Sequence, residues 1–478
     1  MWRFLCERMR MFGDSTLKDQ DKRYPYSLFV KMAEEHGCKL KTALPPHAKC
    51  AVLCDSGLHT ALAILSCWYA KLVPIPMSKH YGERHCSAIR ELTEPDCIIC
   101  DSVFHDSDAL TYRIDLGEFT RNAPIFAPEA DLRDVALIMC TSGTTGKPKG
   151  AMITVDGLQA NILAISDYFA LNRSDTILIA RPLYHCAVLT GELLISLYLG
   201  LNICFYDEKY NPSNVIGLCD RFRITVLCGT PTLFRQISLL SKRTKIKLPL
   251  RVVALSGECL TREVAVQIRE ALPETILYHV YGLTEAAPRV AYLPPDQFDS
   301  MPEFVGLPLK NTQIKIVDCE TFRERSPKTA GVVIINAPSL MKGYYRNPER
   351  TAQVFRDGWL NTGDVGFLDE DGYLQILART DDMIIKAGMN MYPKEIENAI
   401  STLPEISDVV AYGVKAQTGQ EIAVHVVLSN GYENTTVKQL LHAFTGVLPN
   451  HQMPAQVHIV AALERNSSGK LVRPRANS

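Results

Sequence analysis

The sequence predicts an α/β fold: a large amino-terminal part of helix-covered β-sheets with a β-rich subdomain, then a small α+β carboxy-terminal part. Three observations lead to this prediction. Short apolar segments that end in polar or glycine-rich loops alternate with helical stretches between Val135 and Tyr281. Strand and turn patterns replace helices between Gly331 and Ile376. After Arg379 helices and strands mix again over about a hundred residues, the size of a small domain.

The overall composition is that of an ordinary globular chain. Of its 478 residues, 47% are hydrophobic and 22% are charged, which is enough for several cores and predicts at least two domains. The 51 Lys and Arg residues balance 52 Asp and Glu residues, so the net charge of -1 creates no field that would attract nucleic acid or an anionic membrane. We therefore expect neither nucleic acid nor a membrane as a partner.

The cysteines and the apolar segments indicate the cellular compartment in which the protein is expected to occur. The fifteen cysteines are scattered, and the close pair Cys97 and Cys100 has no second pair at zinc-ligand spacing, so reduced thiols are expected and a metal site is not. Charges interrupt the first apolar residues before a signal-peptide core can form, and no segment reaches about 18 uncharged apolar residues. These features predict a cytoplasmic protein.

Five segments of the large part are predicted to be short buried strands. They cover residues 135–140, 176–180, 224–228, 252–256 and 276–281. The clearest unit is an amphipathic helix at 214–222, a strand that ends at Cys228, and a loop at 229–232 that opens another helix. Repeated units of this kind predict parallel strands covered by helices, with the chemistry in loops at the carboxyl ends of the strands.

The remaining elements define the β-rich subdomain and the small domain. Strands are predicted at 331–335 and 372–376 with a hairpin turn at 369–372, and the last part should contain helices at 394–403 and 437–448 and strands at 409–414 and 421–428. We place the domain boundary at Thr380–Asp381. This gives a large domain of residues 1–379 and a small domain of residues 380–478.

A segment suited to bind phosphate follows the strand at 135–140. The ten residues from Thr141 to Gly150 contain three glycines, four hydroxyls and two lysines. Glycines let backbone N–H groups approach anionic oxygens, hydroxyls donate hydrogen bonds and lysines supply positive charge. The segment is not a Walker loop, which needs Gly at position 141 and Ser or Thr at position 148. The predicted phosphate-binding residues are Thr141, Ser142, Gly143, Thr144, Thr145, Gly146 and Lys147.

This segment resembles the phosphate-loop signature of the adenylate-forming superfamily, which comprises acyl-CoA synthetases, peptide-synthetase adenylation domains and firefly luciferases. Further motifs of the family match in order along the chain: Ser256-Gly257-Glu258, Val280-Tyr281-Gly282-Leu283-Thr284-Glu285, Trp359-Leu360-Asn361-Thr362-Gly363-Asp364, Ala378-Arg379-Thr380-Asp381-Asp382 and Arg465-Asn466-Ser467-Ser468-Gly469-Lys470. The resemblance covers the whole chain, although the part before Val135 matches weakly.

The resemblance implies the nucleotide site. Tyr281 packs on adenine, beside Gly257, Glu258 and Gly282, and Thr284 contacts the α-phosphate of ATP. In the same way, Glu285 holds Mg²⁺, Asp364 accepts the ribose hydroxyls and Arg379 contacts the nucleotide. The residue types suit these roles, since an aromatic face stacks on a base and a carboxylate oxygen binds a hard cation.

The resemblance also implies a two-step reaction. A substrate carboxylate attacks the α-phosphorus of ATP while Lys470 neutralises the developing charge, and pyrophosphate leaves. The small domain is then mobile: it rotates about the hinge residue Asp381 and opens a tunnel, lined by Gly388 and Asn390, for a phosphopantetheine thiol. Lys386 lies one position late relative to the frequent lysine of the family, so we assign it no role in thiol handling.

The acid-binding residues leave the substrate class open. The resemblance places His185, Cys186, Ala187, Gly257 and Val280 around the acyl group, and these mostly small residues favour an aliphatic or aryl acid. Peptide-synthetase domains have an aspartate for the amino group where this chain has Cys186. Arg289, which in the family reaches the acyl pocket, suggests the alternative of a dicarboxylate or glutamate-like substrate. A surface position, or a pair with a protein acid, is the structural alternative for Arg289.

The thiol acceptor is either free CoA or the phosphopantetheine of a separate carrier protein, because no carrier domain follows Lys470 in the sequence. A catalytically silent nucleotide or acyl-adenylate binding protein is the alternative of another class, and a luciferase-type oxidation ranks last. A binder would have no need of the lysine, so the matches at Glu285, Asp364, Arg379 and Lys470 favour an acid–thiol ligase. The sequence does not predict an oligomeric state.

Overall fold

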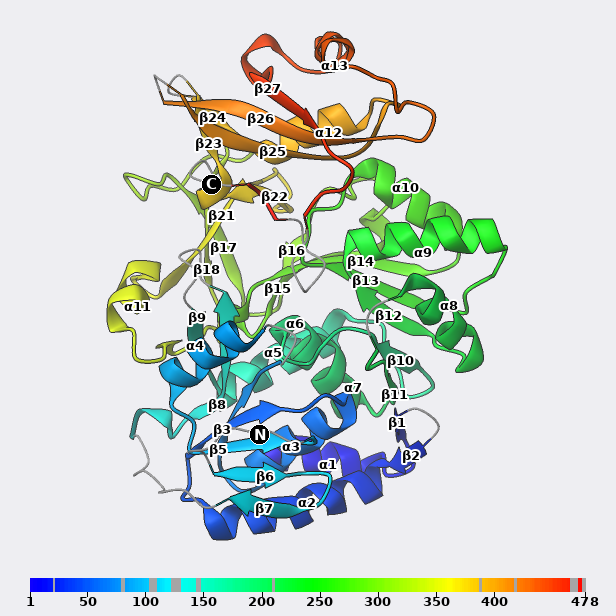
Figure 1. Ribbon diagram of the computed structural model, residues 1–478. Helices are drawn as coiled ribbons and strands as arrows, with labels where there is room; N and C mark the ends of the chain where they lie inside the picture. Colours follow the sequence, from blue (N-terminus) through cyan, green and yellow to red (C-terminus); the bar gives the residue numbers. More distant parts are fainter. Residues whose placement is uncertain are drawn as a thin grey trace.

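The computed structural model describes residues 1–19, 22–78, 82–102, 110–121, 130–142, 148–208, 211–386, 389–416, 419–464 and 472–474. A large amino-terminal body built on several sheets lies below a smaller carboxy-terminal unit (Figure 1). The mixed α/β architecture agrees with the fold class predicted from the sequence.

The largest sheet has nine strands in the order β16-β15-β14-β13-β12-β10-β11-β1-β2. Its strands are β1 (Thr16–Asp19), β2 (Lys22–Pro25), β10 (Thr176–Ile179), β11 (Asn202–Phe205), β12 (Val226–Gly229), β13 (Val252–Ser256), β14 (Ile276–Gly282), β15 (Arg289–Leu293) and β16 (Leu307–Pro308). The central strands β11, β10, β12, β13 and β14 are parallel, whereas β15 runs antiparallel to β14. The carboxyl ends of the parallel strands therefore meet at one edge.

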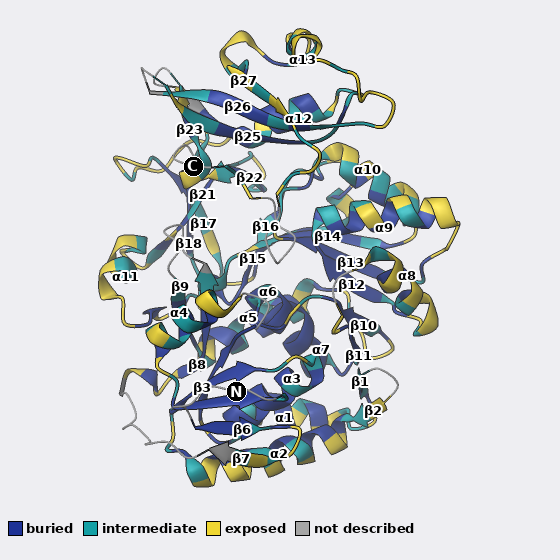
Figure 2. Cartoon of the chain, in the orientation of Figure 1, coloured by how far each residue is buried: buried dark blue, intermediate teal, exposed yellow. Residues whose placement is uncertain are grey.

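Both faces of the central strands are buried, because alternate side chains join two different cores. Leu227 and Val253 face a core that contains residues of three helices, α8 (Pro212–Arg221), α9 (Pro231–Thr244) and α10 (Arg262–Ala271). Val226 and Val252 face the main core instead. Figure 2 shows buried strands and helices whose outer sides are exposed.

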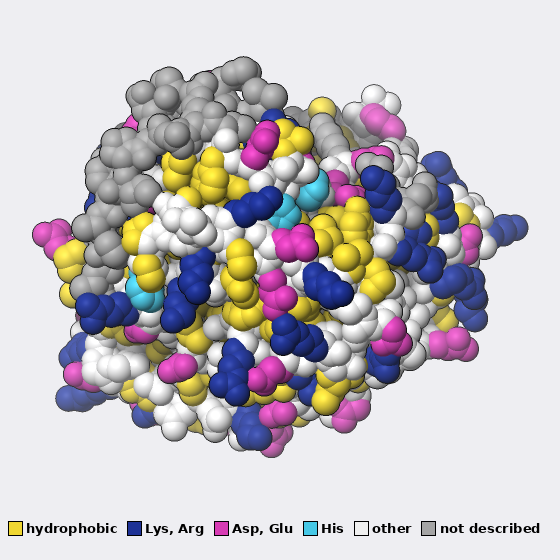
Figure 3. Space-filling model, turned by 90° about the horizontal axis from the view of Figure 1, so that it is seen from below, with side chains coloured by type: hydrophobic (Ala, Val, Ile, Leu, Met, Phe, Trp, Pro, Cys, Tyr) yellow, Lys and Arg dark blue, Asp and Glu magenta, His cyan; other side chains and the backbone are white. Residues whose placement is uncertain are grey.

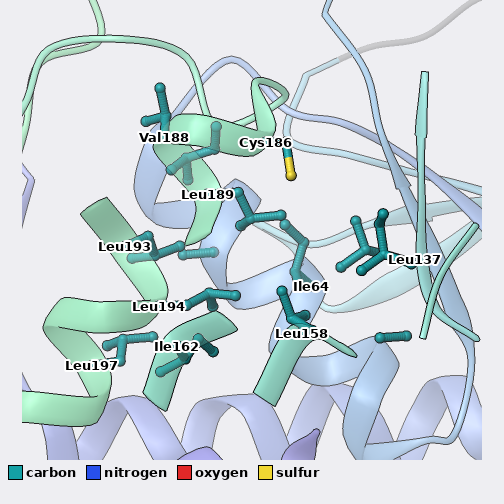
Figure 4. Close-up of a cluster of buried hydrophobic side chains, with 14 of the residues drawn as sticks. Ile64, Leu137, Leu158, Ile162, Cys186, Val188, Leu189, Leu193, Leu194 and Leu197 are labelled. Atoms are coloured by element: carbon teal, nitrogen blue, oxygen red, sulfur yellow. The ribbon is translucent and has the colours of Figure 1, made fainter. Parts of the chain in front are cut away.

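The main core also holds an irregular helical segment. It consists of the short α6 (Cys186–Val188), the π-helix η3 (Leu189–Leu194) and α7 (Ile195–Leu199), and α5 (Val155–Tyr168) also contributes residues to this core. Figure 4 shows Leu189, Leu193 and Leu194 among Ile64, Leu137, Leu158 and Ile162. All of these side chains are almost completely buried, so the π-helix is held firmly in place from its apolar side.

A second α/β layer is formed by the first part of the chain. Its five-stranded sheet has the order β4-β3-β5-β6-β7. Its elements are α1 (Trp2–Met11), α2 (Tyr26–Ala43), β3 (Lys49–Leu53), α3 (Gly57–Tyr69), β4 (Val73–Pro76), α4 (Glu83–Thr93), β5 (Cys97–Cys100), β6 (Thr111–Arg113) and β7 (Glu118–Arg121). The sequence analysis assigned no strands here.

The next two sheets are antiparallel. The order β19-β9-β8 joins β8 (Val135–Ser142), β9 (Pro148–Thr154) and β19 (Gly343–Tyr344). The predicted β-rich subdomain contains β17 (Gln313–Val317), β18 (Gly331–Asn336), α11 (Pro348–Val354), β20 (Phe355–Arg356), β21 (Trp359–Leu368) and β22 (Leu374–Arg379). β21 and β22 pair across the turn at 369–372, as predicted.

The carboxy-terminal unit combines two helices with a two-stranded sheet, β23-β24, and a three-stranded sheet, β25-β26-β27. Its elements are β23 (Ile384–Lys386), β24 (Met389–Met391), α12 (Pro393–Ser401), β25 (Ile406–Ala416), β26 (Gly419–Leu428), α13 (Val437–Phe444) and β27 (Gln456–Ile459). Its apolar residues form a core of their own. The short 3-10 helices are η2 (Ala130–Leu132), η4 (Thr284–Ala286), η5 (Pro295–Gln297), η6 (Thr380–Asp382) and η7 (Asn450–Gln452), of which η6 connects β22 to β23. The boundary at Thr380–Asp381 stays a prediction.

The predicted strands and helices are present, with one difference in how they pair. β8 does not run parallel to its neighbours, because the apolar residues Ala151, Met152 and Ile153 follow the glycine-rich segment at once and form an antiparallel hairpin with it. α13 ends at Phe444, four residues earlier than expected.

The distribution of charged side chains on the surface agrees with the net charge of -1. Figure 3 shows basic and acidic side chains interspersed over one face of the molecule. No helix in the described part of the chain combines the length and the apolar character that a bilayer crossing requires.

Candidate active site

Two loops meet at the carboxyl edge of the central strands. β13 ends at Ser256, opposite Val280 of β14, so the loops that start at Gly257 and Gly282 are neighbours. Gly257 has a φ of 87°, in the left-handed region that favours glycine. Glu258 of the first loop accepts two hydrogen bonds at Oε2 from Thr232 of α9, one from the hydroxyl at 2.7 Å and one from the amide at 3.2 Å. The predicted adenine-side residues are therefore brought together.

A tyrosine, a carboxylate and an arginine from distant segments form the centre of the site. Tyr281 Oη donates a hydrogen bond to Oδ2 of Asp364, and Arg379 Nη1 donates to Oδ1 of the same carboxylate at 2.9 Å. Asp364 and Arg379 face each other across β21 and β22, and Asp364 is 6% exposed. Burial and the Asp364 carboxylate raise the pKa of Tyr281 well above its ordinary value, so the phenol stays protonated. The three predicted nucleotide residues thus share one network.

The predicted metal ligand has a tyrosine partner. Tyr344 Oη donates a hydrogen bond to Oε1 of Glu285 at 2.8 Å, which fixes the orientation of the carboxylate. Thr284 lies beside it in η4. No group of three or more metal-binding side chains occurs in the described ranges. A single carboxylate suits Mg²⁺, which keeps its waters and is usually held by one or two carboxylates together with substrate phosphates.

The antiparallel hairpin carries the predicted phosphate loop. β8 and β9 pair up to Thr141 with Lys149 and Ser142 with Pro148, so the two ends of the loop are held together. The residues Gly143, Thr144, Thr145, Gly146 and Lys147, and the side chain of Ser142, lie outside the described residues. β19 pairs with β9 and brings Tyr344 opposite Ala151, which places Glu285 close to this hairpin.

Tyr344 and Lys149 are functional candidates that the sequence analysis did not select. The Lys149 ammonium lies 5.6 Å from the centre of the Tyr344 ring. Burial, together with the Arg350 guanidinium, lowers the pKa of Lys149, while the Glu285 carboxylate opposes this shift. Lys149 belongs to the ten-residue glycine-rich segment, so its position was a usable signal. Nothing in the sequence points from Tyr344 to Glu285.

The proposed catalytic lysine lies outside the described residues, as does Gly388 of the predicted tunnel and the side chain of Asn390. The described residues on both sides of the lysine segment are joined by a hydrogen bond from the Val472 amide to the Glu464 carbonyl oxygen, at 2.9 Å. Arg473 then lies 3.5 Å from Asp382 and pairs with Glu397 of α12. The described residues that flank the segment therefore contact Asp382, the neighbour of the predicted hinge residue Asp381, which is exposed in η6.

Three of the predicted acyl-pocket residues, His185, Cys186 and Ala187, come shortly before the π-helix in the chain. Cys186 and Val280 are 4% and 2% exposed, His185 and Ala187 are half-buried, and Gly257 is exposed. Burial, followed by the Arg181 guanidinium, lowers the pKa of His185 to about 4, so its ring is neutral near pH 7. Burial raises the pKa of Cys186 to about 12.

Arg289 does not reach solvent. Its exposure is 4%, which excludes the surface position that the sequence left open. It lies near a second buried ionic group, in which Arg181 Nη2 is 2.6 Å from Oε1 of Glu192. Arg181 and Glu192 interrupt an otherwise mostly apolar stretch, a signal that the sequence analysis did not use. The wall around the predicted acyl pocket is thus not purely apolar.

Comparisons with known proteins show the family. The family model described as AMP-binding enzyme matches residues 7–345, and the model described as AMP-binding enzyme C-terminal domain matches residues 395–470. The long-chain-fatty-acid–CoA ligase of Salmonella typhimurium is 32% identical over 377 residues, which cover 77% of this chain and 66% of that ligase, just under two thirds.

Two further matches are a curated relative and a solved structure. A feruloyl-CoA synthase of Amycolatopsis is 30% identical over 343 residues, covering 72% of this chain and 69% of that protein. The solved structure of ATP-bound MatB from Rhodopseudomonas palustris superposes with a TM-score of 0.86 at 26% identity, covering 98% of this chain and 97% of that one.

Proposed function

Because the chain belongs to the AMP-binding enzyme family, we propose that it activates a carboxylic acid with ATP as an acyl-adenylate and transfers the acyl group to the thiol of CoA. The observation that carries the proposal is the network of Tyr281, Asp364 and Arg379. Asp364 and Arg379 are 15 positions apart, and Tyr281 lies 83 positions before Asp364, yet the three converge at the edge of a parallel sheet, where ligands of α/β folds bind.

ATP is the substrate that this edge fits. Tyr281 offers an aromatic face to the adenine, and Asp364 offers two acceptor oxygens to the ribose hydroxyls. When ATP binds, the ribose hydroxyls would donate hydrogen bonds to Asp364 in place of those that it receives here from Tyr281 and Arg379. The residues at 141–147 and Thr284 would bind the phosphates, since hydroxyl and backbone N–H groups donate hydrogen bonds to anionic oxygens.

Glu285 is the residue that would hold Mg²⁺. The bound cation would neutralise phosphate charge during attack of the carboxylate. Tyr344 keeps the Glu285 carboxylate oriented, and Lys149 adds positive charge next to it. Lys470 stabilises the charge that develops on the α-phosphate, a role transferred from its position in the family motif.

The second step uses the same site in another arrangement of the small domain. Asp381 is the hinge, and Gly388 and Asn390 line the path of the thiol after rotation. CoA is the acceptor we favour, because the curated relatives are named CoA ligases. A separate carrier protein is the other acceptor with the same thiol chemistry. The free cysteines fit a reducing compartment such as the cytoplasm.

Pyrophosphate release from ATP tests the proposal. The purified protein is given fatty, aryl, dicarboxylic and amino acids with hydroxylamine, which traps adenylates as hydroxamates. At least one class should give acid-dependent pyrophosphate and a hydroxamate, and Asp364→Asn should lower both by weakening ATP binding. ATP binding without turnover of any acid would instead favour a silent nucleotide-binding protein.

A further inference from the structure

A buried ionic cluster lies on the main-core side of the central sheet. It consists of Arg181, which follows β10, Glu192 of the π-helix, and Arg289 at the start of β15. The Glu192 side chain is 1% exposed and the Arg181 side chain 15%. Tyr168 and Cys228 lie close enough to Arg289 for its charge to influence their pKa values. Three charged side chains therefore share one largely dry region.

Several atoms of this cluster have no hydrogen-bond partner in the described structure. They are Nε of Arg181, Oε2 of Glu192, Nε of Arg289 and Oη of Tyr168. An unsatisfied buried donor or acceptor costs free energy, and a charged one costs more. A cluster built only for stability would satisfy these atoms or replace them with apolar ones. Its open hydrogen-bonding capacity points to a ligand.

The cluster carries excess positive charge. Two guanidiniums face a single carboxylate, and the other titratable neighbours are neutral near pH 7, since burial raises the pKa of Tyr168 and of Cys228 to about 12. Burial also raises the pKa of Glu192, with both arginines acting against that shift. Whether Glu192 is ionised or protonated, the net charge is positive. An anionic group is the complement that the cluster lacks.

The π-helix is shaped to admit Arg289. A Cβ added at Gly191 would lie 2.6 Å from Nη2 of Arg289, so a larger residue at this position would require the guanidinium to move. The flanking leucines, Leu189 and Leu193, point into the apolar core (Figure 4). π-Helical turns often occur at functional sites. The arginine is therefore accommodated by the local backbone and is not a chance intrusion.

The cluster adjoins the proposed reaction site. Arg289 pairs with Gly282 across β14 and β15, directly before the residues proposed to bind the α-phosphate and Mg²⁺. Cys186 lies at the start of the helical segment that carries Glu192, and the charge of Glu285 contributes to raising the pKa of its thiol. An acid whose carboxylate reacts near Glu285 would extend its other end toward Arg289.

We propose that Arg289, supported by Arg181 and Glu192, binds a second carboxylate of the substrate, so that the acid activated by this chain is a dicarboxylic acid. This inference rests on the proposed acid–thiol ligase function. It makes Arg289 the residue that determines specificity, by pairing its guanidinium with the distal carboxylate. Unlike the aliphatic or aryl acid favoured by the small residues around Cys186, the substrate then has a charged end.

The test compares α,ω-dicarboxylic acids of increasing length, each with its own monomethyl ester, in the pyrophosphate-release assay. The ester has nearly the same shape but lacks the distal charge. At the best length, kcat/KM for the diacid should exceed that for the ester by on the order of 100-fold, because a site built for a polar group rejects an analogue that leaves it unpaired. Equal kcat/KM values for diacid and ester at every length would overturn the proposal.

Three variants locate the effect. Arg289→Met should lower kcat/KM for the diacid by on the order of 100-fold and change that for the ester only a few-fold. Arg289→Lys should restore part of the preference. Arg262→Met, which removes an exposed arginine paired with Glu303, is the matched control and should leave the ratio unchanged. An unchanged ratio in Arg289→Met would contradict the inference.

A binding measurement separates this inference from the proposed function. The diacid should raise the melting temperature of the wild-type protein more than its ester does, and this difference should vanish in Arg289→Met. Absence of pyrophosphate release with every acid would defeat the ligase proposal, while the melting shifts would still decide the role of Arg289. The same shift with diacid and ester would sink the inference even in an active enzyme.

Discussion

At the scale of single residues, the site is organised by pairs in which one side chain orients another. Asp364 is fixed by Tyr281 and Arg379, and Glu285 is fixed by Tyr344. Such orientation matters because a carboxylate that must meet a ribose or a cation is effective only in one rotamer. We therefore expect Tyr344 to act as a positioning residue for Glu285.

Replacing Tyr344 with Phe tests this positioning role. Without the hydroxyl, the Glu285 carboxylate loses its orientation, and the concentration of Mg²⁺ needed for half-maximal pyrophosphate release should rise about 10-fold, by analogy with residues that support metal ligands. The KM for the acid should change little. The measurement is the Mg²⁺ dependence at saturating ATP.

Tyr412→Phe supplies the control, since Tyr412 bonds His425 within the carboxy-terminal unit, away from Glu285. If Tyr344→Phe raises the acid KM and leaves the Mg²⁺ dependence as it was, Tyr344 has another role.

At the scale of elements, the π-helix connects the apolar core to the ionic cluster. Leucines fix one side of it, while Glu192 and the space at Gly191 form the other. A helix of regular α-geometry would spread its side chains evenly every 3.6 residues. The bulge therefore matters for where Glu192 and Arg289 meet.

Gly191→Ala should disturb the packing of Arg289 beside Glu192. The added methyl group would contact Nη2 of Arg289, so the free energy of unfolding should fall by about 1–3 kcal/mol, as for overpacked cores. The preference for a diacid should fall as well, because the guanidinium is displaced. Chemical denaturation and the paired-acid assay measure the two effects.

Gly217→Ala is the matched variant. Gly217 lies in α8 with open space around its Cβ position, so alanine there should stabilise by about 0.5–1 kcal/mol through helix propensity. A Gly191→Ala protein as stable and as selective as the wild type would show that the glycine is dispensable.

At the scale of the whole molecule, the proposed mechanism assigns the nucleotide and acid sites to the large amino-terminal part and the lysine to the carboxy-terminal unit. That unit has its own apolar core and is linked through η6, with Arg235 of α9 donating a hydrogen bond to the Ser407 carbonyl oxygen at 3.0 Å. Few such contacts need to break for it to rotate.

Two substitutions should separate the two steps. Lys470→Ala should lower adenylate formation by on the order of 100-fold or more, since an electrostatic stabiliser of the transition state is lost. Asp381→Pro should do the reverse, restricting the hinge and slowing thioester formation from a supplied acyl-adenylate. Both steps are measured separately, one by pyrophosphate release and the other by consumption of CoA thiol.

Glu370→Pro is the control for the proline, because position 370 follows Asp369 in the turn at 369–372, where proline is favoured. Equal loss of both steps in Lys470→Ala would contradict its assigned role. Undiminished thioester turnover in Asp381→Pro would defeat domain rotation.

Features that depend on neighbouring residues were predicted from the sequence, whereas features that depend on distant residues were not. β13 was predicted residue for residue and β14 to within one, because short apolar runs bounded by loops are local patterns. The pairing of β8 with β9 was not predicted, since strand partners depend on contacts far along the chain. The sheet that begins at β3 was missed for a similar reason: its strands are short, and they are recognisable only beside one another.

The sequence by itself determined the fold class and the family, and it predicted the residues of the nucleotide site, because glycines, hydroxyls and carboxylates at fixed spacing are local signals. Only the tertiary structure decided that Arg289 is buried, that Arg181 and Glu192 join it, and that Tyr344 orients Glu285. The burial of a side chain and the identity of its partners depend on segments that are distant in sequence. The net charge around Arg289 therefore depends on the contacts that the fold creates.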